Sequence, residues 1–229
     1  MTARAGKPEQ LPLDFRHEAA SGRDDLVVSD PVSAAAAIID RWPAWPSPVV
    51  IIAGPEGSGK SHLAEVWARR SGARRVRPVP GSDAVMRAGE GPVLVEDVDR
   101  DGFGQAELFH LINAVRSAGT SLLITARSWP VAWGVTLPDL GSRLKAATTV
   151  EIGPPDDLLL SQILVKLFAD RQLLADDRIV AYLVPRMERS LAAAQSIVER
   201  LDRLALARGT RISRALAAEV LGALSRQDD

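Results

Sequence analysis

One segment of the sequence has the glycine, lysine and hydroxyl spacing of a phosphate-binding loop: Gly54, Pro55, Glu56, Gly57, Ser58, Gly59, Lys60 and Ser61. It follows an apolar run of strand length at residues 49–53 and precedes a helical pattern at residues 60–71, the context that such a loop requires. Glycines let the backbone turn its N–H groups toward phosphates, and the helix adds its positive end. We expect Lys60 to reach the β- and γ-phosphates and Ser61 to hold Mg²⁺. The segment therefore predicts binding of ADP or ATP with Mg²⁺; a glycine-rich turn without nucleotide is the alternative.

Two acids, Glu96 and Asp97, follow a second apolar run at residues 93–95. In a sheet with a phosphate-binding loop, a strand end of this kind carries a metal-side carboxylate and a water-activating carboxylate. Any strand may end in acids, so the pattern gains its meaning from the loop at residues 54–61. We expect Glu96 beside Mg²⁺ and Asp97 as the base. Asp99 is expected to be a solvated loop acid.

Three further side chains are candidates for contacts with the γ-phosphate or with the water that attacks it. Thr125 ends an apolar strand and could orient a water there, although a polar strand end is the alternative. Arg143 lies where a positive group can project to a neighbouring subunit's nucleotide and stabilise a transferring phosphoryl group; a surface salt bridge is the alternative. Arg189 precedes a helical pattern and either folds over the nucleotide or faces solvent.

The order of expected elements indicates the fold class. Strands are expected at residues 49–53, 75–79, 93–96, 121–125 and 148–152, and helices at 32–42, 60–71, 105–118 and 137–146. Alternation of helices with strands that are apolar on both faces predicts an α/β domain with a parallel sheet covered on both sides. Beyond residue 154 only helical patterns remain, at 158–173, 176–184, 191–206 and 213–224. We therefore expect an α/β domain over residues 26–154 and a small all-helical domain over residues 155–229.

Residues 1–25 lack periodicity and are expected to form a flexible arm. The arm holds one short island, a polar anchor followed by spaced apolar side chains: Gln10, Leu11, Leu13 and Phe15. Exposed Leu and Phe side chains in a tail are typical of a peptide that binds a partner's groove. The alternative is that the arm docks on its own core.

Composition excludes several classes of protein. With 28 Lys and Arg against 29 Asp and Glu, the net charge of −1 is not that of a histone-like nucleic-acid binder. The absence of cysteine excludes disulfides and thiolate metal sites, and the three histidines share no ligand spacing. No apolar stretch is long enough to cross a membrane, so a cytoplasmic protein is expected. The Arg-rich stretch at residues 186–214 is either a solvated face or a nucleic-acid contact.

Together these motifs resemble the AAA+ family, and within it the proteins related to the bacterial replication initiator DnaA. The resemblance runs from about Asp24 to Ala207. Its most specific parts are residues 54–61, residues 93–97, Thr125 with Pro130, Ser142-Arg143-Leu144, Ile152 with Pro154 and Pro155, and Arg189-Ser190-Leu191. It implies a five-stranded parallel P-loop sheet sandwiched by helices and followed by a helical lid. It also implies that Arg143 is an arginine finger acting in trans and that Arg189 is the second-sensor arginine of the lid.

The segment Gln10–Phe15 resembles the Q-L-x-L-x-F peptide that docks on the sliding clamp (beta) of DNA polymerase III. The initiator has a C-terminal DNA-binding domain, and this chain is expected to stop where that domain would begin. The resemblance therefore implies a regulator that docks on the DNA-loaded clamp and promotes hydrolysis of DnaA-bound ATP, with DNA contacted through the clamp, a possible homo-oligomer and no membrane contact. The alternatives are a helicase loader or remodelling ATPase that hydrolyses its own ATP, and an adaptor with a structural nucleotide.

Two departures from the family pattern fall in the γ-phosphate region. Glu96 stands where the initiator has an aspartate, and Arg127 stands where it has an acid in the loop after Thr125. Both changes imply weak hydrolysis at the chain's own site. The finger can still act on a partner.

Overall fold

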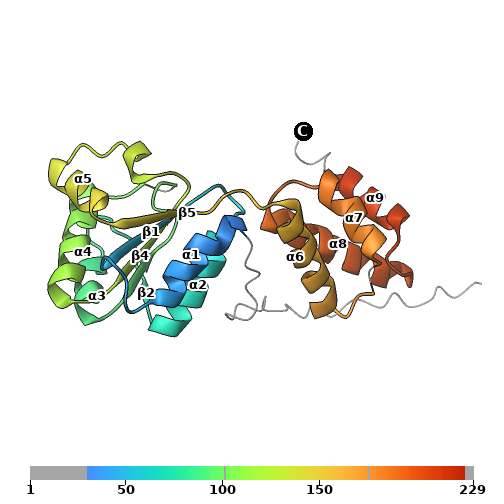
Figure 1. The fold of residues 1–229 in the computed structure, drawn as a ribbon, viewed down its shortest axis with the longest axis horizontal. Helices are drawn as coiled ribbons and strands as arrows, with labels where there is room; N and C mark the ends of the chain where they lie inside the picture. Colours follow the sequence, from blue (N-terminus) through green and yellow to red (C-terminus); the bar gives the residue numbers. More distant parts are fainter. Residues whose placement is uncertain (1–29, 101, 175, 225–229) are drawn as a thin grey trace, which may run out of the picture.

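Five parallel strands form one sheet in the order β2-β3-β4-β1-β5 in the computed structural model, which describes residues 30–100, 102–174 and 176–224 (Figure 1). The strands are β1 (Val49–Ala53), β2 (Arg74–Arg75), β3 (Val93–Val95), β4 (Leu122–Ala126) and β5 (Thr148–Glu151). The central strand β1 pairs with β4 through Ile51 and Ile124, and with β5 through Ile51 and Thr149. The expected α/β class and five-stranded parallel sheet are confirmed.

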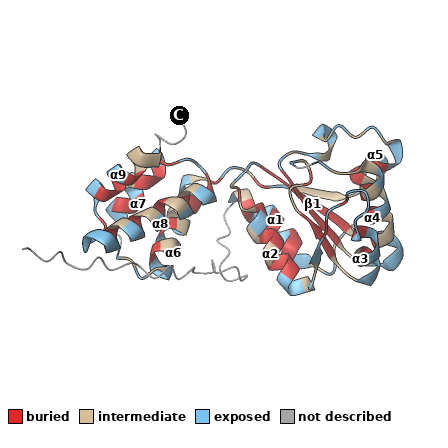
Figure 2. Cartoon of the chain, turned by 180° about the vertical axis from the view of Figure 1, so that it is seen from behind, coloured by how far each residue is buried: buried red, intermediate tan, exposed pale blue. Residues whose placement is uncertain are grey.

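Helices cover both faces of the sheet, because successive side chains of a strand point to opposite sides. On one face α1 (Asp30–Arg41) and α2 (Lys60–Ser71) pack on Ile52 of β1 and its neighbours. On the other face α3 (Ala84–Glu90), α4 (Gln105–Ala118) and α5 (Pro138–Lys145) pack on Ile51 and its neighbours. Figure 2 shows the sheet buried between these layers. This arrangement brings the carboxyl ends of β1, β3 and β4 to one edge.

Beyond β5 the chain is helical, with α6 (Asp157–Asp170), α7 (Asp177–Leu183), α8 (Leu191–Arg208) and α9 (Arg214–Leu224). Short 3₁₀ turns lie at Pro130–Ala132 (η2) and Val184–Arg186 (η3). Three of the helices begin at capping side chains: those of Asp156, Asp176 and Ser190 accept hydrogen bonds from the first turns of α6, α7 and α8. The helices bury a core of their own, drawn from residues of α6 to α9 and the loops between them. We refer to α6–α9 as the helical part.

Two elements differ from expectation. The strand expected at residues 75–79 is only Arg74–Arg75, and its last sheet contact is the hydrogen bond from Val76 N to Leu94 O (2.9 Å). Pro78 lacks the N–H that a continuing strand needs, which explains the early end. The short helix α3 was not expected, because seven residues show little periodicity.

No helix within the described residues is long and apolar enough to cross a membrane.

Candidate phosphate-binding site

The loop of residues 54–61 leaves the carboxyl end of β1 and enters α2. Gly54 N donates to Ala126 O of β4 at 3.1 Å, and a Cβ on Gly54 would lie 2.5 Å from Ile152 O. Gly57 and Gly59 have φ angles of +72° and +98°, in the left-handed region that favours glycine. Backbone conformation and close approach therefore require glycine at all three positions.

Unpaired donors line this loop. The backbone N–H groups of Gly57, Gly59, Lys60 and Ser61 find no acceptor among the described residues. The hydroxyl of Ser58 is buried, also without a partner in that part of the chain. The first amides of a helix lack intrahelical acceptors and carry the positive end of the helix dipole. Such a row of donors fits the oxygens of a phosphate chain.

Lys60 lies at the mouth of the loop and is 5% exposed. Its Nζ donates to the carbonyls of Gly54 (2.8 Å) and Pro55 (2.7 Å). Burial lowers the pKa of Lys60, and the charge of Asp97 opposes that shift most strongly. Lys60 is therefore a buried cation that an anion such as phosphate would stabilise further.

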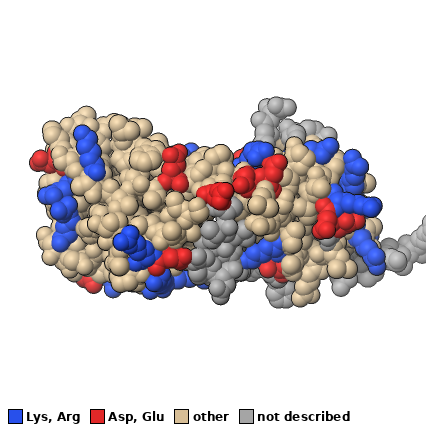
Figure 3. All heavy atoms as spheres, in the orientation of Figure 1, with Lys and Arg blue, Asp and Glu red and all other residues tan. Residues whose placement is uncertain are grey.

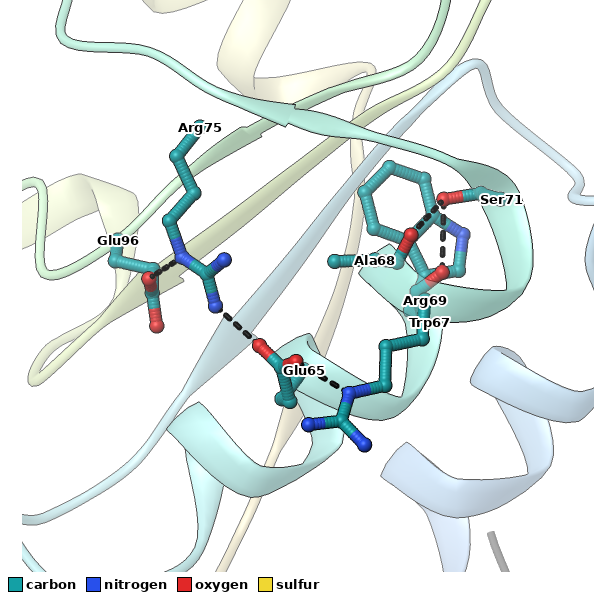
Figure 4. A network of polar contacts seen from close by, with 7 residues as sticks. All are labelled: Glu65, Trp67, Ala68, Arg69, Ser71, Arg75 and Glu96. Carbon is teal, nitrogen blue, oxygen red and sulfur yellow. Dashed lines mark hydrogen bonds and ion pairs between the residues drawn. The ribbon is translucent and has the colours of Figure 1, made fainter. Parts of the chain in front are cut away.

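Glu96, which was expected beside Mg²⁺, forms an ion pair with Arg75. Its carboxylate accepts from Arg75 Nε at 2.7 Å, and Arg75 also binds Glu65 of α2 (Figure 4). The charges that act on Lys60 include Asp97 and Asp99 but not Glu96. Of the two acids that directly follow β3, Asp97 is therefore the one whose charge acts on Lys60. Ser61, the other expected metal ligand, is exposed in the first turn of α2.

Thr125 holds Asp97 in place. Thr125 is fully buried, and its Oγ1 accepts a hydrogen bond from Asp97 N at 2.9 Å. Asp97 has a φ angle of +45°, which is unusual for a residue other than glycine and is typical of functional sites. The Thr125 hydroxyl thus lies against backbone, where it positions Asp97, and not on the open side of the loop where it was expected to orient a water.

Asp99 is a positioning residue that sequence reasoning missed. Its carboxylate accepts from Arg127 N (2.8 Å), Ser128 N (2.8 Å) and Ser128 Oγ (2.7 Å). Partial burial raises the pKa of Asp99, but these hydrogen bonds outweigh it and hold the pKa below its ordinary value. Asp99 is therefore not the solvated acid expected. The pairing of β3 with β4 creates this contact, and no spacing in the sequence signals it.

Arg127 projects from the same loop over the phosphate-binding segment. Its Nη2 lies 2.9 Å from Glu56 Oε2, and its charge contributes to lowering the pKa of Lys60. A second cation therefore stands next to Lys60 at the mouth of the loop.

The helical part touches the loop directly. Leu191 N donates to Gly57 O at 2.9 Å, and a Cβ on Gly57 would lie 2.5 Å from the Cβ of Ser190. Arg189 precedes these contacts in the chain, and its Nη2 lies 2.7 Å from Asp157 Oδ1 on an exposed surface. Arg189 is thus next to the loop along the backbone, while its guanidinium pairs with an acid at the start of α6.

Arg143 lies at the opposite edge of the sheet. It is in the last turn of α5, five residues before β5 begins, at the edge where parallel strands start (Figure 1). The phosphate-binding loop leaves the edge where they end. Arg143 has no ion-pair or hydrogen-bond partner among the described residues. It cannot serve the chain's own loop and is free to contact another molecule.

No cluster of three or more His, Cys, Asp or Glu side chains able to hold a metal occurs in the described ranges. A magnesium site here would depend on nucleotide oxygens together with Ser61 and an acid. The segment Gln10–Phe15 lies outside the described residues.

No known protein-family profile matches the chain. An uncharacterized protein of Haemophilus influenzae is 28% identical over 173 residues, which are 69% of this chain and 75% of that protein. Domain III of the Thermotoga maritima replication initiation protein DnaA is similar in structure, with a TM-score of 0.74 and 17% identity over 88% of this chain and 95% of that domain.

Two other solved structures are similar. DnaA from Aquifex aeolicus, bound to AMPPCP, gives a TM-score of 0.65 and 18% identity over 81% of this chain and 66% of its own. The Thermotoga maritima RuvB Holliday junction branch migration motor gives 0.71 and 14% over 89% of this chain and 72% of its own. The chain therefore has the α/β fold seen in DnaA domain III.

Proposed function

We propose that the chain is a nucleotide-binding regulator of replication initiation that acts on DnaA-bound ATP, the role of the DnaA-related regulator Hda. The phosphate-binding loop supports the nucleotide: its unpaired amides and the buried Lys60 suit the phosphates of ADP or ATP. The AMPPCP bound by the structurally similar DnaA supports an adenine nucleotide. Mg²⁺ would be held by nucleotide oxygens, Ser61 and Asp97.

One observation carries the regulatory role. Arg143 lies at the strand-start edge, away from its own loop and without a partner among the described residues. A guanidinium presented in this way can enter the nucleotide site of a neighbouring AAA+ subunit. There it stabilises the charge that develops on the transferring phosphoryl group. DnaA is the neighbour that the similarity of fold favours.

The chain's own site is poorly equipped for hydrolysis. Arg75 binds Glu96, and Arg127 pairs with Glu56 at the mouth of the loop. The ion pair with Arg75 competes with a metal ion for the Glu96 carboxylate. Gly57 of the loop is hydrogen-bonded to Leu191 of the helical part. In this proposal a nucleotide bound at the loop stabilises that contact. Hydrolysis then occurs in the partner.

The arm would bring the protein to its place of action. Gln10, Leu11, Leu13 and Phe15 have the anchor types of a peptide that binds a clamp groove. Docking on a DNA-loaded sliding clamp would concentrate the regulator where DnaA is to be inactivated. DNA is contacted through the clamp in this account.

ATP turnover tests the proposal against its alternatives. The purified protein alone, the protein with ATP-loaded DnaA, and both with clamp on DNA are compared for phosphate release. The regulatory role predicts little release by the protein alone and a large increase only in the complete mixture. Rapid release by the protein alone would indicate a remodelling ATPase, and no increase in any mixture would indicate an adaptor.

A further inference from the structure

A second, basic pocket lies on the helical part between α7 and α9. It has a volume of about 680 Å³ and is lined by Asp176, Arg178, Ile179, Ala181, Tyr182, Arg186, Ile212, Ser213 and Arg214. Three of its lining residues are arginines. On the face drawn in Figure 3, Lys and Arg side chains gather at the outer end of the helical part. This pocket does not overlap the phosphate-binding loop.

The pocket arginines lack acidic partners among the described residues. Eight arginines elsewhere lie within 4 Å of a carboxylate: Arg69, Arg74, Arg75, Arg87, Arg127, Arg189, Arg203 and Arg208. Arg178, Arg186 and Arg214 form no such ion pair within the described part of the chain. Three uncompensated positive charges around one pocket repel one another unless an anion binds between them.

Tyr182 orients two of these guanidinium groups. The Cζ atoms of Arg186 and Arg214 lie 4.3 and 4.7 Å from the centre of its ring, and Arg186 Nη1 also donates to Tyr182 O at 3.1 Å. Stacking on an aromatic ring fixes the guanidinium plane while its N–H edge stays available. Such an edge donates two parallel hydrogen bonds to a phosphate.

The one acidic residue among those that line the pocket, Asp176, binds a backbone N–H group. Asp176 caps α7, and its Oδ1 accepts from Arg178 N at 3.0 Å. The side chain of Arg178 remains without a carboxylate among the described residues. The pocket therefore keeps a net positive charge in a chain whose total charge is −1.

We propose that this pocket binds the phosphodiester backbone of DNA, with Arg178, Arg186 and Arg214 on its phosphates. A backbone carries one negative charge per nucleotide at regular spacing, which matches several fixed guanidinium edges around one pocket. In this proposal the guanidinium edges meet phosphates, which carry no sequence information, so binding is independent of sequence. The helical part would thus hold DNA directly, beyond the contact through the clamp described above.

Fluorescence anisotropy with labelled single-stranded and duplex oligonucleotides tests this site, without clamp, DnaA or nucleotide. The triple variant R178A/R186A/R214A is compared with the matched control R74A/R87A/R203A, which removes the same charge from carboxylate-paired arginines. We expect the pocket variant to bind DNA at least tenfold more weakly than wild type and the control to bind as wild type does. The slope of log K against log salt should fall by about 2 to 3, since each phosphate contact contributes about 0.7 to 0.9. Thermal unfolding checks that both variants are folded.

The same assay distinguishes DNA from an acidic polypeptide as the anion that the pocket binds. Preference for the single strand or for the duplex identifies the form of DNA bound, and either supports the site. Polyglutamate of equal charge should compete poorly, because its planar carboxylates lack the tetrahedral geometry and the regular backbone spacing of phosphodiesters. Equal competition would assign the pocket to an acidic protein segment and overturn the proposal, as would equal losses in the two triple variants or no DNA binding by wild type. Because no clamp or DnaA is present, these outcomes are independent of the regulatory role.

Discussion

The N–H of Leu191 donates to the carbonyl of Gly57 at 2.9 Å, so the helical part and the phosphate-binding loop are joined by a backbone hydrogen bond. The adjacent residue, Ser190, lies so close to Gly57 that no side chain fits between them. Any change in the loop at this point must therefore move the helical part.

The variant G57A tests this coupling. Its Cβ would meet Ser190 at 2.5 Å, and a left-handed alanine costs about 1 to 2 kcal/mol in addition. The matched control is G72A, because Gly72 has a similar φ of +69° and open space around its Cβ. We expect both to lower the free energy of unfolding in urea, and only G57A to weaken ADP binding, by at least tenfold. Equal nucleotide affinity in the two variants would contradict the coupling.

In the proposed function, Lys60 supplies the positive charge that binds the phosphates. We expect K60A to weaken ADP and ATP binding at least tenfold, because charge-assisted hydrogen bonds contribute about 1.5 to 3 kcal/mol. Titration calorimetry measures the change. K145A, which removes an exposed lysine from α5, is the control and should bind as wild type does. Unchanged affinity in K60A would contradict the proposal that this loop binds the phosphates of ADP or ATP.

Asp99 makes stability depend on pH. Its pKa is lowered in the folded protein, so its stabilising contribution is present above the ordinary pKa of about 3.9 and is lost as pH falls through the folded value. The variant D99N loses the charge and replaces one of the two acceptor oxygens that serve Arg127 and Ser128 with an NH₂ donor. We expect it to be about 1 to 3 kcal/mol less stable at pH 7. The difference from wild type should shrink toward pH 3 in urea unfolding. A difference that stays constant with pH would show that the carboxylate charge is not responsible.

The arm is tested through clamp binding. Replacing Gln10, Leu13 and Phe15 together with alanine should abolish binding to the sliding clamp, because each apolar anchor contributes roughly 1.5 to 3 kcal/mol when buried. Nucleotide affinity should stay as in wild type. Co-elution of this variant with the clamp would mean that the peptide assignment is wrong.

Local sequence was sufficient for the loop and most of the sheet. The segment Gly54–Ser61 carries its own turn, donors and lysine in consecutive residues, so its form follows from spacing alone. The apolar runs of β1 and β4 likewise predict buried parallel strands. By contrast, β2 was placed too late and α3 was missed, because short elements depend on their neighbours more than on periodicity.

Contacts between side chains on neighbouring strands, and between the loops that follow those strands, could not be predicted. Glu96 looked like a metal ligand because it ends β3, yet Arg75 on the neighbouring strand β2 binds it. Asp99 looked like a loop acid, yet the loop after β4 donates three hydrogen bonds to it. Both contacts depend on which strands are adjacent in the sheet. The spacing of residues in a single sequence does not reveal that order.

The central claim is tested most directly by the release of phosphate from ATP-loaded DnaA in the presence of clamp on DNA. We predict that R143A eliminates the stimulation, since an arginine supplied in trans accounts for about 10³ to 10⁵ in rate in well-studied GTPases, and that R143K barely restores it. R116A, which removes an exposed arginine that also has no partner among the described residues, should stimulate as wild type does. Folding, nucleotide binding and clamp binding should be unchanged in all three variants. Near-normal stimulation by R143A would contradict the account.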